Sequence, residues 1–204
     1  MTAEKLDFKA TIMRGLGNLI RPVYTNGQVN FIFHIYKIKT VVGENTYGKI
    51  NVYSYQKKGE IVIGRYTSIS EISLILGGDH HRGITVYPFK SKFLKLDTSL
   101  DNQSAQNIII GNDCWIGHNV TIMEGVTIAS GSIIGANSLV TRSTNAYSIN
   151  VGSPSKEIFK RFSEEEIAKL LESKWWELPK NVLLKYLDLL YGKDIDEFLI
   201  KIKK

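Results

Sequence analysis

The sequence predicts a mainly β protein. Its body is a parallel β-helix, with one long loop expelled from the coil, a helix before it and a helical tail after it. Three observations predict this fold. Aliphatic residues recur every six positions from residue 110, the recurrence breaks over residues 79–107, and both flanks carry apolar residues at helical spacing. We divide the chain into an N-terminal helix and lead-in (1–40), the β-helix (41–155) and a C-terminal helical tail (156–204).

The six-residue repeat is the clearest feature of the sequence. Its aliphatic member falls at Ile110, Ile116, Ile122, Ile128, Ile134 and Val140. A period of six fits neither an α-helix nor a coiled coil. It fits a coil of triangular section, in which each hexad makes one strand and one corner, and three hexads complete a turn. We expect the aliphatics to fill the interior, and a small residue such as Gly111 to let the backbone turn beside them.

The repeat is interrupted once. Residues 110–145 provide two full coils, and fainter hexads begin earlier, at Val42 and Ile63. Between them, residues 79–107 leave the register altogether. Because connections in a compact domain are usually short, so long a loop is usually functional. We expect this segment, called the expelled loop below, to carry part of a site.

The N-terminal flank has a helical pattern. Apolar residues are spaced helically between Leu6 and Ile20, and basic residues lie among them, which predicts a basic amphipathic helix. Such a helix usually packs on its own protein or on a subunit. Peripheral contact with an anionic membrane is the alternative.

The C-terminal flank predicts three helices. The segment SEEE at 163–166 is a capping box that opens a helix through about Ser173. A second helix is expected over residues 179–191, ended by Gly192, and a short third over 194–203.

Composition and charge exclude several classes of function. The 204 residues are 43% apolar and 23% charged, which is typical of a globular protein. Most of the net charge of +6 lies in residues 1–40, so the β-helix lacks the basic stripe of a nucleic-acid-binding domain. No apolar run approaches the roughly 18 residues of a membrane span, and no signal peptide opens the chain. The one cysteine, Cys114, fits a reducing compartment, so we expect a cytoplasmic protein.

Several separated motifs resemble one family. They are GGDH at 77–80, YPF at 87–89, GNDCWIG at 111–117, VGSPSK at 151–156, RFS at 161–163 and KWW at 174–176. The third and fourth, with the hexads between them, look like the hexapeptide-repeat acyltransferases. The others resemble the xenobiotic acetyltransferase subgroup of that family. The resemblance covers about residues 41–176.

The resemblance implies a left-handed coil, a homotrimer and transfer of acetyl from acetyl-CoA to a hydroxyl. We predict a sugar or polysaccharide acceptor, because a basic N-terminal helix would hold a surface-glycan enzyme near a membrane. The alternatives are an antibiotic hydroxyl of the streptogramin or chloramphenicol type, N-acetylation of an aminosugar, and a trimeric β-helix that serves only as a non-catalytic scaffold. An intact GGDH motif favours an enzyme, since a scaffold has no need of the base or its loop.

The acetyl transfer requires a base, and four histidines are candidates. A neutral imidazole suits this role, since its unperturbed pKa is about 6.5. The resemblance assigns the base to His80, at the root of the expelled loop, with His81 as the alternative one position away. His118, next to a corner of the coil, is either a surface residue or a contact of the adjacent subunit's ligand. His34 stands in an apolar run and is expected to be a packing residue.

The resemblance also implies two sets of binding residues. The residues expected to contact acetyl-CoA, in a groove between neighbouring subunits, are Trp115, Gly117, Gly135, Ala136, Thr141, Pro154, Lys156 and Arg161. Among them, backbone groups at Gly135 and Ala136 would pair with pantetheine, while Lys156 and Arg161 would meet phosphates. The residues expected around the acceptor are Tyr47, Tyr53, Tyr55, Asp79, His81, Tyr87 and Phe89.

We expect direct transfer, with a backbone N–H near Gly117 stabilising the oxyanion. An acyl-enzyme is less attractive because the repeat directs Cys114 into the coil. No metal is expected. The gamma-class carbonic anhydrases share this coil and hold zinc with two histidines five residues apart, but Met123 stands five residues after His118 here.

Overall fold

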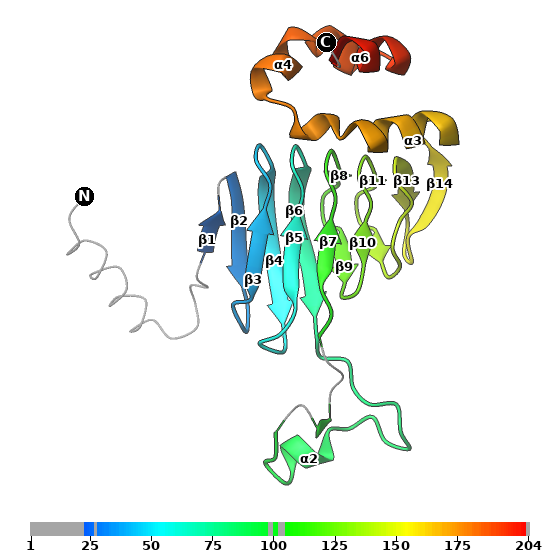
Figure 1. The fold of residues 1–204 in the computed structure, drawn as a ribbon. Helices are drawn as coiled ribbons and strands as arrows, with labels where there is room; N and C mark the ends of the chain where they lie inside the picture. The colour runs from blue at the N-terminus through cyan, green and yellow to red at the C-terminus, as the bar shows by residue number, and fades with distance from the viewer. Residues whose placement is uncertain (1–22, 27, 98–99, 102–104, 203–204) are drawn as a thin grey trace, which may run out of the picture.

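Figure 1 shows the protein in a computed structural model that describes residues 23–26, 28–97, 100–101 and 105–202. Parallel strands stack into a coil, the tail helices cover one side of it, and the expelled loop projects from the opposite side. The strands are β1 (Val23–Asn26), β2 (Gln28–Phe33), β3 (Lys39–Val42), β4 (Tyr47–Ser54), β5 (Glu60–Ile63), β6 (Ser68–Leu76), β7 (Ile108–Ile110), β8 (Trp115–Ile116), β9 (Thr121–Met123), β10 (Thr127–Ile128), β11 (Ile133–Ile134), β12 (Leu139–Val140), β13 (Ser148–Val151) and β14 (Lys156–Lys160). The helices are α2 (Phe89–Lys92), α3 (Glu164–Ser173), the 3-10 turn η2 (Trp175–Glu177), α4 (Lys180–Lys185), α5 (Leu187–Tyr191) and α6 (Ile195–Ile202). Within the described part of the chain, no helix is long and apolar enough to cross a membrane.

The strands form three faces. The first face holds the start of β6 with β8, β11 and β13, the second holds the end of β6 with β9 and β12, and the third holds β3, β5, β7 and β10. Partners in successive coils, such as Ile110 with Ile128 and Ile116 with Ile134, are 18 residues apart. Three hexads therefore complete one coil, as predicted, and the parallel pairing that the prediction required is confirmed. The left hand of the coil stays a prediction.

The interior of the coil is filled by the repeating aliphatics. All six of those predicted to point inward are at most 1% exposed. Burying an aliphatic side chain of this size contributes about 1.5–3 kcal/mol each. The small residues beside them are there because successive coils lie very close: a Cβ on Gly111 would lie 2.6 Å from the backbone nitrogen of Ser130.

The first described coil begins earlier than residue 41. Strand β2 pairs in parallel with β4, and β1 turns back on β2 as an antiparallel hairpin. The parallel sheet thus starts inside the segment expected as the lead-in. The amphipathic helix expected between Leu6 and Ile20 lies outside the described residues.

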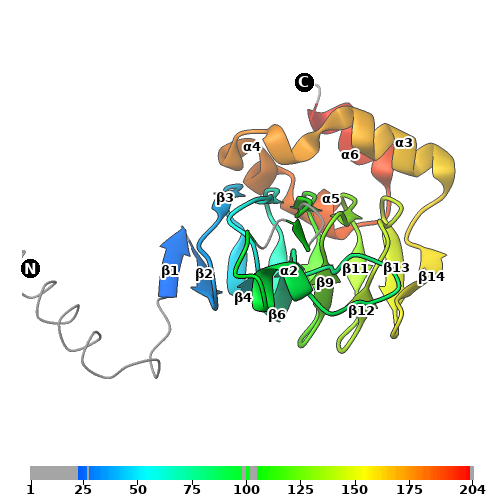
Figure 2. The same cartoon turned by 90° about the horizontal axis from the view of Figure 1, so that it is seen from below.

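The expelled loop leaves the coil between β6 and β7, where the break in the repeat predicted it. Its one helix is the single turn α2. Seen from below, α2 lies in front of the strands, away from the tail helices (Figure 2). The loop is therefore held by its own contacts and by its two ends rather than by the core.

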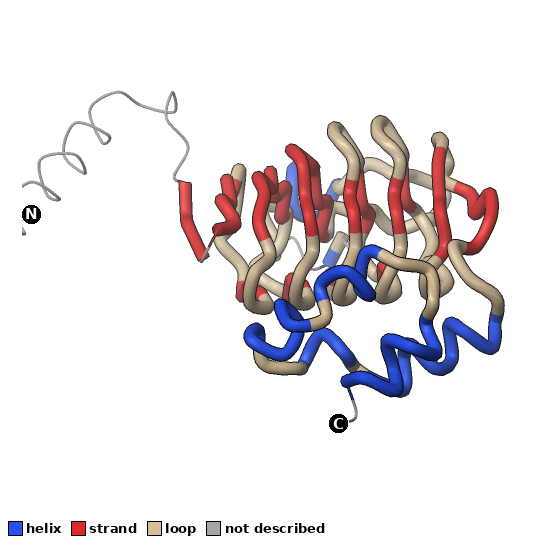
Figure 3. The backbone as a smooth tube through the Cα atoms, turned by 90° about the horizontal axis from the view of Figure 1, so that it is seen from above, coloured by secondary structure: helices blue, strands red, loops and turns tan. Residues whose placement is uncertain are grey.

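The tail packs along one side of the coil. Strand β14 pairs antiparallel with β13, and α3 is capped by the preceding Ser163, whose side chain accepts from the Glu166 N–H in a capping box. The helix expected over residues 179–191 is divided into α4 and α5, because the backbone of Tyr186 (φ −114°, ψ 30°) lies outside the helical region. Seen from above, the helices gather beside the stacked strands (Figure 3). A second apolar cluster around Trp175 and Trp176 joins them to the coil.

Candidate active site

His80 lies at the root of the expelled loop, where the chain turns away from the coil. Strand β6 ends at Leu76, and Gly77 and Gly78 follow with φ of +69° and +84°. Such angles strain any residue with a Cβ, so two consecutive glycines allow this turn. His80 is exposed, and its Nδ1 lies 2.7 Å from the carbonyl oxygen of Val86.

The contact with Val86 defines what the imidazole can do. A carbonyl oxygen only accepts hydrogen bonds, so Nδ1 carries the hydrogen and donates it. In a neutral ring, Nε2 then holds a lone pair and can accept a proton. The structure thus presents His80 in the tautomer that a general base requires.

His81 is held differently. Its backbone N–H donates to the carbonyl oxygen of Asp101 at 3.0 Å, and the residue is half-buried. Among the described residues, the imidazole of His81 makes no hydrogen bond comparable to the one that orients His80. The geometry therefore supports His80 over its neighbour, and the choice stays a prediction.

Besides His81, which follows His80 directly, four of the predicted acceptor residues gather at the root and on the loop. A Cβ on Gly78 would lie 2.8 Å from Cδ2 of Tyr55, which shows that this ring packs on the turn before His80. Asp79 forms an exposed ion pair with Arg82 at 3.4 Å. Further along the loop, the rings of Tyr87 and Phe89 meet edge to face with centroids 4.9 Å apart. The structure therefore brings Tyr55, Asp79, Tyr87 and Phe89 to the same side of the coil as His80.

The other two predicted tyrosines lie elsewhere. The half-buried ring of Tyr53 stacks on His34, with ring centroids 4.1 Å apart and planes 2° apart. Tyr47 begins β4, at the end of the strand away from the loop, and pairs with Ser68. Tyr47 is therefore not brought to His80 within one chain, and the ring of Tyr53 is already stacked on another side chain.

Most of the predicted acetyl-CoA residues share one corner of the coil. Gly117 packs on Ala136 of the next coil, since a Cβ there would lie 2.6 Å from its nitrogen. Gly135 lies beside Val151, and the turn after β13 brings exposed Pro154 and Lys156 to the end of the same corner. Thr141 is exposed just after β12.

Two backbone N–H groups at this corner already donate to the neighbouring coil. The Gly135 N–H, expected to pair with pantetheine, donates to the carbonyl of Asn150 at 2.9 Å. The Gly117 N–H donates to the carbonyl of Ile134 at 2.8 Å, so it cannot be the oxyanion donor itself. Both amides are used by the parallel pairing that holds successive coils together. Any amide that binds ligand here must be a neighbour.

Trp115 is the most conspicuous residue of the first face. It is 59% exposed on β8, in an outward row that crosses this face from one coil to the next. By strand register the row consists of Tyr47, Ser68, Trp115, Ile133, Ile149 and Phe159. Trp115 pairs with the first residue of β6, whereas His80 follows the end of that strand. One chain therefore does not bring Trp115 and His80 together.

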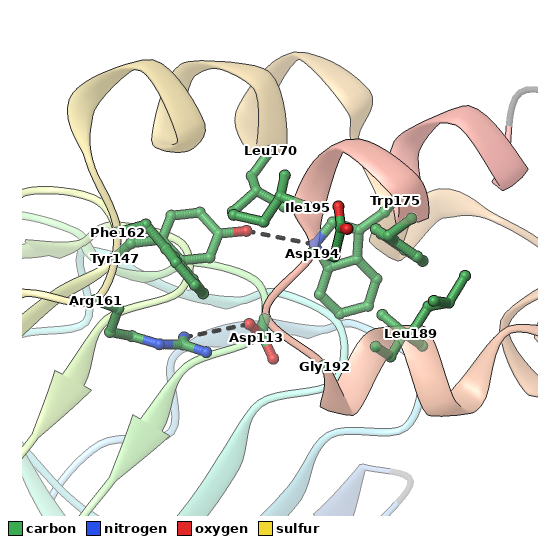
Figure 4. A pocket seen from close by; sticks show the side chains of 12 residues that line it. Asp113, Tyr147, Arg161, Phe162, Leu170, Trp175, Leu189, Gly192, Asp194 and Ile195 are labelled. Carbon is green, nitrogen blue, oxygen red and sulfur yellow. Dashed lines mark hydrogen bonds and ion pairs between the residues drawn. The ribbon is translucent and has the colours of Figure 1, made fainter.

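Arg161 lies on the opposite side of the coil from the expelled loop. Its Nη1 donates to the Gly131 carbonyl at 2.7 Å and lies 3.5 Å from Asp113 Oδ2, and its guanidinium stacks over Tyr147 (Figure 4). Burial raises the pKa of Asp113, and the charge of Arg161 offsets this only in part. These groups line a cavity of about 60 Å³ between the coil and the tail. Arg161 thus joins the tail to the coil, and the structure does not place it beside Lys156.

Cys114 is buried, as the repeat predicted. It is 2% exposed, and burial raises the pKa of its thiol to about 12. The thiol is therefore protonated near neutral pH and is a poor nucleophile. This agrees with a direct transfer rather than an acyl-enzyme.

Comparison with known proteins shows the family. The sequence profile described as "Bacterial transferase hexapeptide (six repeats)" matches residues 107–142. A Lysinibacillus sphaericus protein named "Probable macrolide acetyltransferase" is 38% identical over an alignment of 153 residues that covers 71% of this chain and 85% of that protein. The chain belongs to the hexapeptide-repeat acetyltransferases. The resemblance seen in the sequence and the prediction of an acetyltransferase are therefore confirmed.

Two further similarities agree with this family. A chloramphenicol acetyltransferase of Morganella morganii is 38% identical over an alignment of 143 residues that covers 67% of this chain and 68% of that protein. A hexapeptide-repeat acetyltransferase of Vibrio cholerae, solved in complex with acetyl-CoA, has a similar fold, with a TM-score of 0.50 and 18% identity over 65% of this chain and 72% of that one.

Sequence reasoning missed two carboxylates that hold the expelled loop of this acetyltransferase. Glu124 follows β9, and Asp101 lies inside the loop, where it is only 2% exposed. Neither stands in a motif. Acidic residues are common in turns and loops, so their presence there does not by itself predict a role. The one available signal was that Asp101 lies in a segment already expected to be functional.

Proposed function

We propose that the protein transfers acetyl from acetyl-CoA to a hydroxyl of a small acceptor, with His80 as the general base. The observation that carries this is the hydrogen bond from Nδ1 of His80 to the Val86 carbonyl, which leaves Nε2 as the proton acceptor at an exposed loop root. Nε2 takes the hydroxyl proton as the oxygen attacks the thioester carbonyl carbon. The carbon–sulfur bond then breaks, and the imidazolium returns the proton to the CoA thiolate. No residue is acetylated on the way.

Acetyl-CoA is the donor, and we place it along the corner formed by Gly117, Ala136 and Pro154. The Vibrio cholerae acetyltransferase of similar fold was solved with acetyl-CoA, which supports the choice of donor. Exposed Lys156 ends this corner and offers a charge to a CoA phosphate. Arg161 is already bound to Asp113 and Gly131, so we assign it to the joint with the tail instead.

The site is completed by a second copy of the chain in a homotrimer. Trp115, expected to contact acetyl-CoA in a groove between subunits, stands on the first face and His80 beyond the second, so the tryptophan that joins His80 in one site comes from a neighbour. The outward row around Trp115 supports such a contact, because Trp115 and Phe159 are 59% and 57% exposed on an otherwise regular sheet. Burying them between subunits would remove this apolar surface from water.

For the acceptor we now prefer an antibiotic hydroxyl to the sugar that the sequence alone favoured. The relatives at 38% identity are named for macrolides and chloramphenicol. The expelled loop also carries a cluster of Tyr87, Phe89 and Phe93, with centroids 4.9–5.8 Å apart and all three rings exposed. Such a cluster suits a flat or extended apolar acceptor. The argument for a sugar depended on the N-terminal helix, which lies outside the described residues.

The test follows release of free CoA thiol with acetyl-CoA and a panel of acceptors: chloramphenicol, a macrolide, a streptogramin and maltose. We expect turnover with one of the antibiotics. His80→Ala should lower kcat by about 10²–10⁴-fold while acetyl-CoA still binds, and His81→Ala, the matched control, should lower it far less. Turnover of maltose alone would restore the sugar acceptor. A folded protein that neither binds nor turns over acetyl-CoA would be a scaffold and would overturn the proposal.

A further inference from the structure

The neck of the expelled loop is closed by one carboxylate from the coil. Gly77, where the chain leaves, and Gln106, where it returns, both donate their backbone N–H to Oε2 of Glu124, at 3.1 and 2.7 Å. Glu124 itself follows β9, which pairs on both sides with other strands of the coil. A single side chain anchored in the rigid body therefore fixes both ends of the loop.

Hydrogen bonds to other coils reinforce this neck at its returning end. The Oε1 atom of Gln56 accepts from the Ala105 N–H at 3.3 Å, and Asn107 Oδ1 accepts from the Glu60 N–H at 2.9 Å. Both of these contacts involve the returning end of the loop. Glu124 joins that end to the departing end, from which His80 is three residues away.

A second carboxylate acts inside the loop. Oδ2 of Asp101 accepts from the Ser91 N–H in the first turn of α2 at 2.6 Å, and its own carbonyl accepts from the His81 N–H at 3.0 Å. The residue at the start of α2, Pro88, has no side chain that could cap the helix. Asp101 supplies that missing cap from ten residues away and ties α2 to the segment that carries His80.

Together, these contacts determine the orientation of the His80 imidazole. The ring of His80 is held by the Val86 carbonyl, and Val86 stands just before α2. If α2 shifts relative to His81, the acceptor of the Nδ1 hydrogen bond shifts with it. Neither carboxylate is among the residues that we expect to touch acetyl-CoA or the acceptor.

We propose that Glu124 and Asp101 are positioning residues. They hold the neck and the helix of the expelled loop, so that the imidazole of His80 keeps the orientation in which Nε2 can accept the hydroxyl proton. The inference deepens the proposed function and rests on His80 being the base. Because both residues lie outside the apolar core of the coil, their loss is expected to change the site more than the fold.

The kinetic test uses the whole protein and four variants: Glu124→Ala, Glu124→Gln, Asp101→Ala and Asp101→Asn. Displacing a catalytic group by about 1 Å can cost about 100-fold, so we expect kcat to fall by about 10- to 100-fold in both alanine variants. The KM for acetyl-CoA should stay within about twofold, because its corner is not touched. Glu124→Gln should recover most of the rate, since its amide oxygen can still accept from both N–H groups.

Matched controls come from exposed acids of the tail. Glu172→Ala and Asp188→Asn remove the same charges far from the loop and should leave kcat unchanged. Asp101→Asn should be nearly as slow as Asp101→Ala, because Asp101 accepts from the Ser91 side chain and from the Ser91 and Lys90 N–H groups, so an amide nitrogen in place of one oxygen would face a donor. Unchanged kcat in both alanine variants, or an equal rise in the KM for acetyl-CoA, would overturn the proposal.

A spectroscopic measurement separates this proposal from the proposed function. Long-range ¹H–¹⁵N spectra resolve the ring nitrogens of the four histidines, and His80→Ala assigns the signals of His80. Glu124→Ala should move or broaden the His80 signals and leave those of His34 and His118 in place. Unmoved His80 signals would overturn the positioning role, whatever the activity. Moved signals in a protein whose His80→Ala variant stays fully active would instead remove His80 as the base.

Discussion

The coil over residues 108–140 and the expelled loop beside it are built on opposite principles. In the coil, the same interactions recur every 18 residues: an aliphatic on an aliphatic, a small residue against the next backbone, and a parallel hydrogen bond. In the loop, the described contacts are few and each is different, and several of the important ones end on a carboxylate. Stability is spread evenly over many residues in the first region and concentrated in a few in the second.

The difference explains where the chemistry is placed. A stacked coil transmits any change of one residue to its neighbours in the coils above and below, so it tolerates little variation. A loop held at its neck can change its acceptor-facing side chains without disturbing the stack. His80 lies where the two regions meet, because it follows the end of a coil strand and begins the expelled loop.

The largest effect on stability should come from the interior of the coil. Ile110 is 1% exposed and its neighbour Ile109, on the same strand, is 39% exposed. Ile110→Ala should lower the free energy of unfolding by about 2–5 kcal/mol, because it leaves a cavity between three coils. Ile109→Ala, the control, should cost about 1 kcal/mol or less. Chemical denaturation at one fixed protein concentration measures both, and equal costs would contradict the layered core.

A glycine should matter in the coil and not in the loop. A Cβ on Gly111 would lie 2.6 Å from the backbone nitrogen of Ser130, so Gly111→Ala must push two coils apart and should cost about 1–3 kcal/mol. A Cβ on Gly83 in the loop would first meet Nδ1 of His81, at 3.2 Å. That atom ends a side chain that can move, so we expect Gly83→Ala to change the free energy of unfolding by about 0.5 kcal/mol or less. Thermal denaturation of the two variants gives the comparison directly.

The same contrast decides what could be predicted from the sequence. The hexads, the break at the loop and the capping box at Ser163 are patterns of neighbouring residues, so periodicity finds them. His80 was found because it stands in a motif at the break. The contact between Gly77 and Glu124 joins residues 47 apart, and its partners depend on which coils the loop separates. No local sequence pattern indicates such a pair. The contact of Arg161 with Gly131 could not be predicted for the same reason, because the two residues are far apart in the sequence.

The tail is an intermediate case. Helix α3 is capped by the residue directly before it, Ser163, whereas α2 is capped by the distant Asp101. Ser163→Ala removes the acceptor for the Glu166 N–H and should lower the free energy of unfolding of the tail by about 1 kcal/mol. Glu172→Ala, exposed on the same helix, should stay within about 0.5 kcal/mol of the unmodified protein. Hydrogen exchange of the α3 amides measures the local change. A loss that spreads into the coil would show that tail and coil unfold as one unit.

The smallest effect on the fold should be the acid response of the expelled loop. Burial alone would raise the pKa of Asp101, but hydrogen bonds from the Ser91 side chain and from the Ser91 and Lys90 amides outweigh it and hold the pKa below its ordinary value. The carboxylate therefore stabilises the folded loop above the ordinary aspartate pKa of about 3.9, and this contribution is lost as the pH falls through the lowered value. Below about pH 4 we expect the α2 amides to exchange faster while the coil keeps its circular dichroism.

The control for this response is Asp101→Asn, which cannot titrate. Its α2 amides should exchange fast at every pH, so the acid step should disappear from this helix. Any acid loosening that remains should be confined to the neck of the loop. If the coil and the loop instead respond to acid together, the loop is part of the coil's cooperative unit, and the division between a repeated body and a separately fastened loop is wrong.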